Sequence, residues 1–276
     1  MNVHVLVDNN SFIDRYFLAE PGFSVLIEDE GCRILFDTGY SDAFIRNSQK
    51  MGVDIRHLDF LTLSHSHMDH TWGLDPLIRY YTEMRFAGIS CAKPTLVAHS
   101  QTFVSVIDDT VGELGSLLSE EKVAKHFHMH LTDTPLWLTD RLVFLGQIPR
   151  RNDFESSLRF GRKEGSDEDD WVIEDSALAY KSAHGLVVVT GCSHAGICNI
   201  IAYAMEVCND SRIFDVLGGL HLQKPSPRQL QGTLDYIKGV KVVQMHACHC
   251  TDLESKIALA RVVASKEVGV GLSLHY

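Results

Sequence analysis

Basic residues are scarce in this chain of 276 residues, which has 25 Lys and Arg against 36 Asp and Glu and a net charge of −11. Nucleic acids and anionic membranes both favour basic surfaces, so this balance argues against a general affinity for either partner. A small anionic substrate is still compatible with it, because a bound metal ion can supply the positive charge. We therefore expect a small-molecule substrate, with no nucleic-acid or membrane partner.

Long apolar runs and cysteine pairs are also missing. No stretch approaches the roughly 18 uninterrupted apolar residues that cross a bilayer, and the opening MNVHVLVDNN has neither the basic nor the apolar section of a secretory signal. The seven cysteines are odd in number and contain no CxxC pair. This pattern suits a reducing cytosol better than a secreted disulfide framework, so we expect a cytoplasmic protein.

Strand-like and helix-like patterns occur in the same order in both halves of the chain. The first half predicts strands at 3–7, 23–29, 32–39, 57–65, 94–99 and 141–148, helices at 42–52 and 119–127, and a charged loop at 162–171. The second half predicts strands at 177–182, 186–191, 214–221 and 240–246, with helices at 196–208, 227–239 and 253–266. Two β-rich halves, each followed by helices, predict an α+β protein of the αββα sandwich type. No convincing linker divides the chain, so we expect a single domain over residues 1–276.

Three histidines and an aspartate are gathered in SHSHMDH, residues 64–70. His65 and His67 are two residues apart, so an extended chain projects both imidazoles to the same side, and Asp69 and His70 follow at once. This ligand set is preferred by zinc and acceptable to iron or manganese. The segment therefore predicts a metal site at the end of a buried strand, with a solvated histidine-rich turn as the structural alternative.

The pattern HxHxDH resembles the signature of the metallo-β-lactamase superfamily. The resemblance implies a four-layer αββα sandwich with two divalent metal ions, for which we expect zinc, with manganese or iron as alternatives. His65 and His67 would bind the first metal, and Asp69 and His70 would bind the second, with Asp69 also taking part in catalysis. The FDTG segment resembles the family's first motif, in which Asp37 would orient a ligand histidine through its ring N–H.

Three later segments resemble further motifs of the same family. In TGCSHAGI, Cys192 stands where the family usually has a bridging carboxylate, and His194 lies two residues on. We expect His194 to be a ligand, while Cys192 is either a ligand or structural. In HACHCTD, His249 resembles the last metal ligand, with His246 as its rival. In GGLHL, His221 is a ligand, a proton donor to the substrate or a packed core histidine.

A narrower resemblance covers nearly the whole chain. The segments LVDNN, FSVLIEDEGCRILFDTG, LSHSHMDHTWGL, IPRRNDFE, DSALAY, GLVVVTGCSHAGICNII, GGLHL and HCTD occur in this order. Together they resemble the 7,8-dihydropterin-6-methyl-4-(β-D-ribofuranosyl)aminobenzene 5′-phosphate synthase subfamily. The chain departs from its pattern at Trp72, where glycine is usual, and at Asp252, where HCTG is usual. The segment at about 76–146 is less typical and carries little of this signature.

The arginine-containing segment IPRRNDFE is a candidate for substrate binding. Arg150 or Arg151 could bind an anionic substrate, since the guanidinium suits bidentate phosphate recognition, and Glu155 could reach the site. The alternative is a surface loop with exposed charges.

These features predict a metal-dependent hydrolase that acts on a phosphate ester or a similar small anion through a metal-activated water. The subfamily resemblance implies an alternative, a transferase of the synthase type, and a non-catalytic metal-binding sensor is a third hypothesis. A serine hydrolase based on Ser193 in GCSHA would leave SHSHMDH unexplained. Redox chemistry is also disfavoured, because no electron-delivering module follows in the chain.

Overall fold

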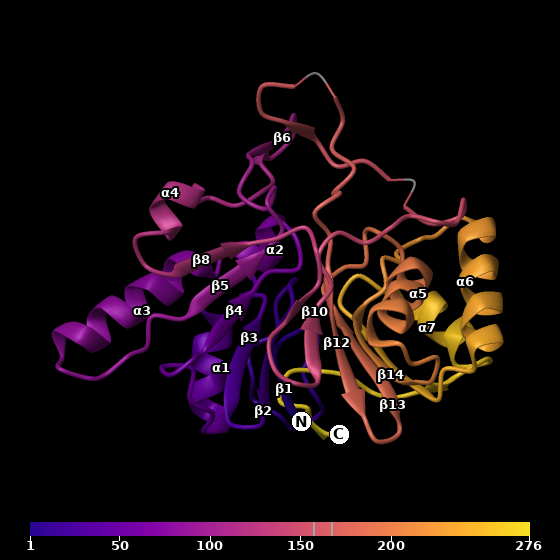
Figure 1. Cartoon of the computed structure of the whole chain (residues 1–276), viewed down its shortest axis with the longest axis horizontal. Coiled ribbons are helices and arrows are strands. Elements are labelled where there is room, and N and C mark those ends of the chain that lie inside the picture. Colours follow the sequence, from indigo (N-terminus) through magenta and orange to yellow (C-terminus); the bar gives the residue numbers. More distant parts are fainter. Residues whose placement is uncertain (157, 167) are drawn as a thin grey trace.

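Two sheets packed face to face form the centre of the molecule, and helices cover both outer faces (Figure 1). The structure, a computed structural model, describes residues 1–156, 158–166 and 168–276. Helices α1 and α3 lie outside the first sheet, and helices α5, α6 and α7 lie outside the second. The predicted αββα sandwich is therefore confirmed.

The first sheet has the order β17-β1-β2-β3-β4-β5-β8. Its strands from β3 to β8 run parallel to one another, whereas β17, β1, β2 and β3 pair in antiparallel fashion. The strands are β1 (Asn2–Val7), β2 (Ser24–Asp29), β3 (Cys32–Phe36), β4 (Phe60–Thr62), β5 (Thr95–Ala98), β8 (His128–Leu131) and β17 (Ser273–His275). The helices on this half are α1 (Ala43–Met51), α2 (Met68–Thr71), α3 (Leu74–Phe86) and α4 (Glu120–Val123).

The second sheet has the order β16-β15-β14-β13-β12-β10-β9. The four strands from β13 to β16 are parallel, and β9, β10 and β12 continue the sheet in antiparallel pairs. The strands are β9 (Leu136–Trp137), β10 (Leu142–Phe144), β12 (Ala177–Ser182), β13 (Gly185–Thr190), β14 (Ile213–Gly219), β15 (Gln244–Cys248) and β16 (Ala264–Ser265). The helices on this half are α5 (Ile197–Cys208), α6 (Pro227–Val240) and α7 (Leu253–Leu259).

Alternation along the strands explains the four layers. In β2, Val25 and Ile27 belong to the core between the sheets, whereas Leu26 belongs to the core under α1 and α3. In β13, Val187 points into the central core, and Val188 packs under α5 and α6. Because both faces of these strands are buried, their centres are continuous apolar runs, VLI in β2 and LVVV in β13.

A small third sheet lies at the top of the view in Figure 1, at the end of the sandwich opposite the two chain termini. It has the order β11-β6-β7, formed by β6 (Val106–Asp108), β7 (Gly112–Glu113) and β11 (Arg162–Lys163). Strand β11 lies within the range predicted as a charged loop, of which residue 167 is outside the described residues.

Several element boundaries differ from those that the sequence predicted. Helix α6 extends to Val240, and Lys241 then takes a left-handed φ of 57°, so β15 begins only at Gln244. Helix α7 ends at Leu259, and the end of its predicted range forms β16 instead. Helix α4 has four residues, fewer than predicted. Within the described residues, no helix is long and apolar enough to cross a membrane.

Candidate metal centre

The motifs of the sequence meet at one edge of the two sheets, where parallel strands end. Asp37 follows β3 and His65 follows β4, and these two strands are parallel. Cys192, His221 and His249 follow β13, β14 and β15, which are also parallel to one another. Because the carboxyl ends of parallel strands lie at the same edge, segments far apart in the chain contribute to one site.

One group of side chains at this edge contains three imidazoles. The ring centroids of His65 and His67, of His65 and His194, and of His67 and His194 are each 4.7 Å apart. The Nε2 atoms of all three are buried and have no hydrogen-bond partner among the described residues. An unpaired buried polar atom costs about 1–3 kcal/mol, so three that converge fit a bound cation. A metal could be held here by His65 and His67, the pair expected for the first metal, together with His194, which was expected to be a ligand.

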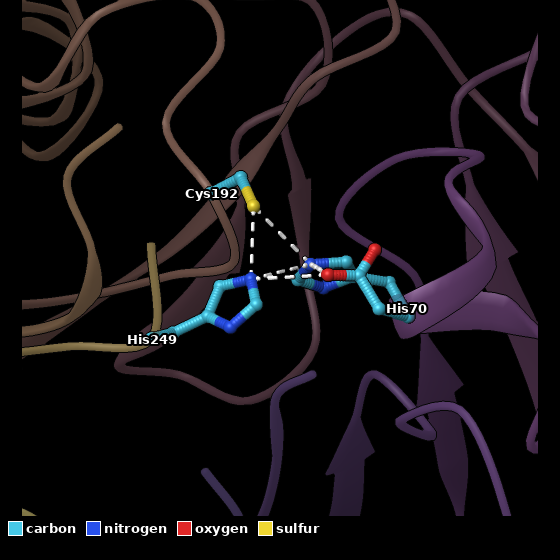
Figure 2. Close-up of side chains that lie close together, drawn as sticks. His70, Cys192 and His249 are labelled. Carbon is cyan, nitrogen blue, oxygen red and sulfur yellow. Dashed lines mark hydrogen bonds and ion pairs between the residues drawn. The ribbon is translucent and has the colours of Figure 1, made fainter. Parts of the chain in front are cut away.

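A second group contains Asp69, His70, Cys192 and His249, and one potential ligand atom from each lies within 4.8 Å of the others. Figure 2 shows the Cys192 thiol and the imidazoles of His70 and His249 directed toward one another. Cys192 Sγ lies 3.3 Å from His70 Nε2 and 3.1 Å from His249 Nε2. Asp69 Oδ2 lies 3.3 Å from His249 Nε2. These donors, two nitrogens, one sulfur and one carboxylate oxygen, are a set that suits zinc.

Asp37 orients a histidine of each group, His70 directly and His65 through Ser64. Its Oδ2 accepts from His70 Nδ1 at 2.7 Å and from the Ser64 hydroxyl at 2.7 Å, and its Oδ1 accepts from the Ser64 backbone N–H. The Ser64 hydroxyl, having donated to Asp37, can accept from His65 Nδ1 at 2.8 Å. Because Nδ1 of each ring is held by these contacts, Nε2 of each ring is the nitrogen that faces the centre. The supporting position predicted for Asp37 agrees with this geometry.

His249 has its own support, which the sequence analysis did not identify. Its Nδ1 lies 2.9 Å from Asn9 Oδ1, and its backbone N–H donates to Asp8 Oδ1. The segment LVDNN, which contains both residues, carried the narrower resemblance, and this was the signal that could have found them. A further supporting residue of this kind is Ser66, whose hydroxyl donates to the buried Glu174 at 2.7 Å.

Burial lowers the pKa values of the imidazoles at this site, and neighbouring carboxylates raise the pKa of one of them. Burial lowers the pKa of His67 to about 3 and lowers the pKa values of His65 and His194 well below the usual value. His70 differs: burial lowers its pKa, but Asp69 and Asp37 outweigh this and raise it to about 9. The imidazoles of the first group are therefore neutral and free to bind a metal, whereas Asp69 and Asp37 stabilise a positive charge at His70.

Four residues at this edge have a backbone conformation that is uncommon for residues other than glycine. The φ angles are 57° at Asp37, 63° at Ser193, 50° at His221 and 49° at His249. Residues held in the left-handed region cost of order 1–3 kcal/mol and cluster at functional sites. The gathering of four at one edge supports a functional role for this edge.

Two carboxylates brace the loops that carry the histidines. Glu174 accepts from Ser66 in the first loop, and Asp175 Oδ2 accepts from the backbone N–H of Ala195, next to His194, at 2.7 Å. Both carboxylates are fully buried. The adjacent residues Glu174 and Asp175 therefore link the loops of the two sheets.

Arg150 and Glu155, the predicted substrate residues, contact the protein itself. The Arg150 guanidinium donates to the carbonyl oxygens of Trp171 and Val172 at 2.6 and 2.8 Å. Glu155 is buried and accepts from the backbone N–H of Cys198, in the first turn of α5, at 3.0 Å. A contact of either with substrate stays a prediction.

His246, Arg151 and Ser193 lie outside both groups of ligand atoms. His246, the rival of His249, pairs with Asp215 at 2.9 Å. Arg151 pairs with the exposed Glu206. The Ser193 hydroxyl donates to the Gly219 carbonyl oxygen at 2.7 Å and also contacts the Thr190 hydroxyl. None of its hydrogen-bond partners in the described part of the chain is a histidine that could activate it as a nucleophile.

Two cavities border the centre on different sides. Phe160 packs against the rings of His67, His194 and His221, and the pocket beneath it leaves only about 10 Å³. On the other side, a cavity of about 470 Å³ is lined by His249 and Cys250 together with Asn9, Asn10, Gln223, Thr251, Asp252, Leu253 and Lys256. A larger cavity of about 700 Å³ near Phe12 and Phe17 contains none of the candidate ligands.

Comparisons with known proteins connect this chain with the metallo-β-lactamase superfamily. The sequence model of the metallo-β-lactamase superfamily matches residues 18–87. An uncharacterised protein of Methanocaldococcus jannaschii is 29% identical over 94% of each chain. The 7,8-dihydropterin-6-methyl-4-(β-D-ribofuranosyl)-aminobenzene-5′-phosphate synthase of the same organism is 25% identical over 93% of this chain and 89% of its own. A crystal structure described as a metal-dependent hydrolase of the β-lactamase superfamily superposes with a TM-score of 0.83 and 26% identity, covering 100% of this chain and 99% of the other.

Proposed function

We propose that this member of the metallo-β-lactamase superfamily is a metal-dependent hydrolase with a binuclear site, acting on a phosphate ester or a similar small anion. The observation that carries the proposal is the convergence of three unpartnered Nε2 atoms, those of His65, His67 and His194 in the described part of the chain, beside the group of Asp69, His70, Cys192 and His249. The first three residues would hold one metal ion, and the other four would hold the second.

Divalent ions bound there would lower the pKa of a water molecule and stabilise negative charge on the substrate. The chain's own residues would do the rest. Asp37 would fix the orientation of His70 and, through Ser64, of His65. His221, which borders the site beside His194, would donate a proton to the leaving group, and Phe160 would limit the access of bulk water.

The substrate would approach through the cavity of about 470 Å³ that His249 borders, because its volume suits a small molecule. Lys256 lines the same cavity and is the cation available there for a phosphate. Asn9, Asn10 and Gln223 would supply hydrogen bonds to the uncharged part of the substrate.

The test combines metal content with turnover. Purified protein should contain close to two zinc, manganese or iron ions per chain and hydrolyse bis(p-nitrophenyl) phosphate, and chelation should remove both metal and activity. His67→Ala and Asp69→Ala should lose metal and turnover. His130→Ala is the matched control, because His130 is an exposed histidine on the edge strand β8. An active, metal-free His67→Ala protein would overturn the proposal.

The transferase alternative has less support, since the synthase relative is only 25% identical. The two departures from its subfamily also have structural roles here. Trp72 stacks on Tyr40 and donates to the Gly115 carbonyl oxygen, and Asp252 caps α7 by accepting from Ser255. Two bound metals without any phosphoesterase activity would favour the transferase or a non-catalytic sensor over the hydrolase.

A further inference from the structure

A second thiol, that of Cys250, lies beside the Cys192 thiol of the metal centre. Cys192, His221 and Cys250 each offer a ligand atom, and these atoms lie within 4.8 Å of one another. Cys192 also belongs to the group of Asp69, His70 and His249, and its thiol lies within the same 4.8 Å of the ligand atoms of His65 and His194. Cys250 belongs only to the group with Cys192 and His221. The function proposed above assigns no role to Cys250.

The His221 ring nitrogen can serve this third group. Its Nδ1 is buried and has no hydrogen-bond partner within the described residues, although the His221 backbone N–H donates to Cys250 Sγ at 3.3 Å. The residue is held at a φ of 50°, in the left-handed region, which only surrounding contacts can maintain. A buried lone pair with no partner beside two sulfurs is the arrangement that a cation would stabilise.

The backbone is shaped around the Cys250 sulfur. A Cβ at Gly219 would lie 2.6 Å from Cys250 Sγ and 3.1 Å from His249 Cδ2, so the absence of a side chain at Gly219 makes room for both. Cys250 Sγ makes two long hydrogen bonds with backbone groups, donating to the Cys192 carbonyl oxygen at 3.4 Å and accepting from the His221 N–H. The position of the Cys250 sulfur is thus closely fixed, while its two hydrogen bonds are long and leave it able to bind a cation.

We propose that Cys250, His221 and Cys192 form a third, sulfur-rich metal subsite that binds a thiophilic cation such as Cd²⁺, Cu⁺ or a further Zn²⁺. Two sulfurs and one imidazole are softer than the three nitrogens of the first group, and soft ligands select these ions. The inference goes beyond hydrolysis, because the third ion is not needed for it. An ion bound there would engage Cys192 and His221 and would therefore inhibit the hydrolase.

The experiment is a titration of the metal-free full-length protein with Cd²⁺ in a non-thiol reductant, which keeps the thiols from forming a disulfide. Bound cadmium is counted by equilibrium dialysis, and cadmium–thiolate bonds are followed by their ultraviolet charge-transfer absorbance. The wild-type protein should bind three ions per chain. Cys250→Ser should bind two and lose part of the absorbance. Cys208→Ser is the matched control, because Cys208 is a buried thiol on α5 that belongs to none of the groups.

A second variant keeps the test informative if Cys250→Ser fails to fold. His221→Gln leaves both sulfurs in place and should also bind two ions. Equal counts and equal absorbance in wild type and both variants would overturn the proposal. Two cadmium ions in the wild type, with hydrolysis intact in the zinc-loaded protein, would overturn the subsite and leave the hydrolase standing. Three cadmium ions, with no hydrolysis in a protein loaded with only two equivalents of zinc, would support the subsite and overturn the hydrolase.

Discussion

The Ser66 hydroxyl, between the two leading histidines of the motif, donates to Glu174 Oε1 at 2.7 Å, and both side chains are fully buried. The two residues are 108 positions apart in the chain. The contact therefore ties the loop that carries His65 and His67 to the segment that precedes β12 in the other sheet.

Removing this contact should loosen the metal loop. Ser66→Ala leaves Glu174 Oε1 without its donor, and an unsatisfied buried group costs about 1–3 kcal/mol of unfolding free energy. We expect that loss in urea unfolding, together with weaker zinc binding. Ser90→Ala, at an exposed serine, is the control. Unchanged stability and zinc affinity would show that the contact does not support the loop.

Asp37→Asn should weaken metal binding without removing any ligand. An amide can accept through its oxygen only, so it cannot replace both carboxylate oxygens that hold His70 and Ser64. Loss of such a support costs about 10–100-fold in metal affinity. Competition with a chromophoric chelator measures this, with Asp235→Asn on the exposed face of α6 as the control. Equal affinities in both variants would contradict the role given to Asp37.

Asp175 should make stability depend on pH. Burial raises its pKa from 3.8 to about 8, although the Ala195 N–H and Arg150 oppose this. Between these values the folded state keeps a proton that the unfolded state releases, so stability falls as pH rises, by up to about 1.4 kcal/mol per pH unit.

Asp175→Asn has no such proton, and its side-chain oxygen can still accept from Ala195. The stability of the variant relative to wild type should therefore increase from about pH 5 to about pH 7.5. Urea unfolding of both proteins in chelator checks this, since the histidines titrate equally in the two. Parallel pH profiles would mean that Asp175 is ionised throughout.

His221→Gln should slow hydrolysis selectively. A general acid contributes about 10²–10⁴-fold, and mainly where the leaving group needs a proton. We expect a loss of about 10²-fold in kcat on an alkyl phosphate ester and a much smaller loss on a p-nitrophenyl ester, with two zinc ions still bound. His184→Gln, at an exposed histidine, should leave both rates unchanged. Equal losses on both esters would assign His221 a role other than proton donation.

Local sequence determined the elements of the sandwich and most of the candidate site. Apolar strands buried on both faces are recognisable as short runs such as LVVVT, and ligand-type residues stand immediately after them. The HxHxDH spacing depends only on the geometry of an extended chain entering a turn, so His65 and His67 could be predicted together. The boundaries of β15 and α7 could not, because the packing of neighbouring elements decides where a helix stops.

Only the tertiary structure decided which distant residues meet. Nothing in the spacing of Asn9, Glu174 or Cys250 pairs them with His249, Ser66 or Cys192, because these contacts form only when parallel strands of two sheets end at the same edge. The same holds for Arg150 and Glu155, whose charges are directed to backbone groups that the sequence does not place near them. A residue's type and local spacing determine what it can bind, and the packing of the two sheets determines what lies within reach.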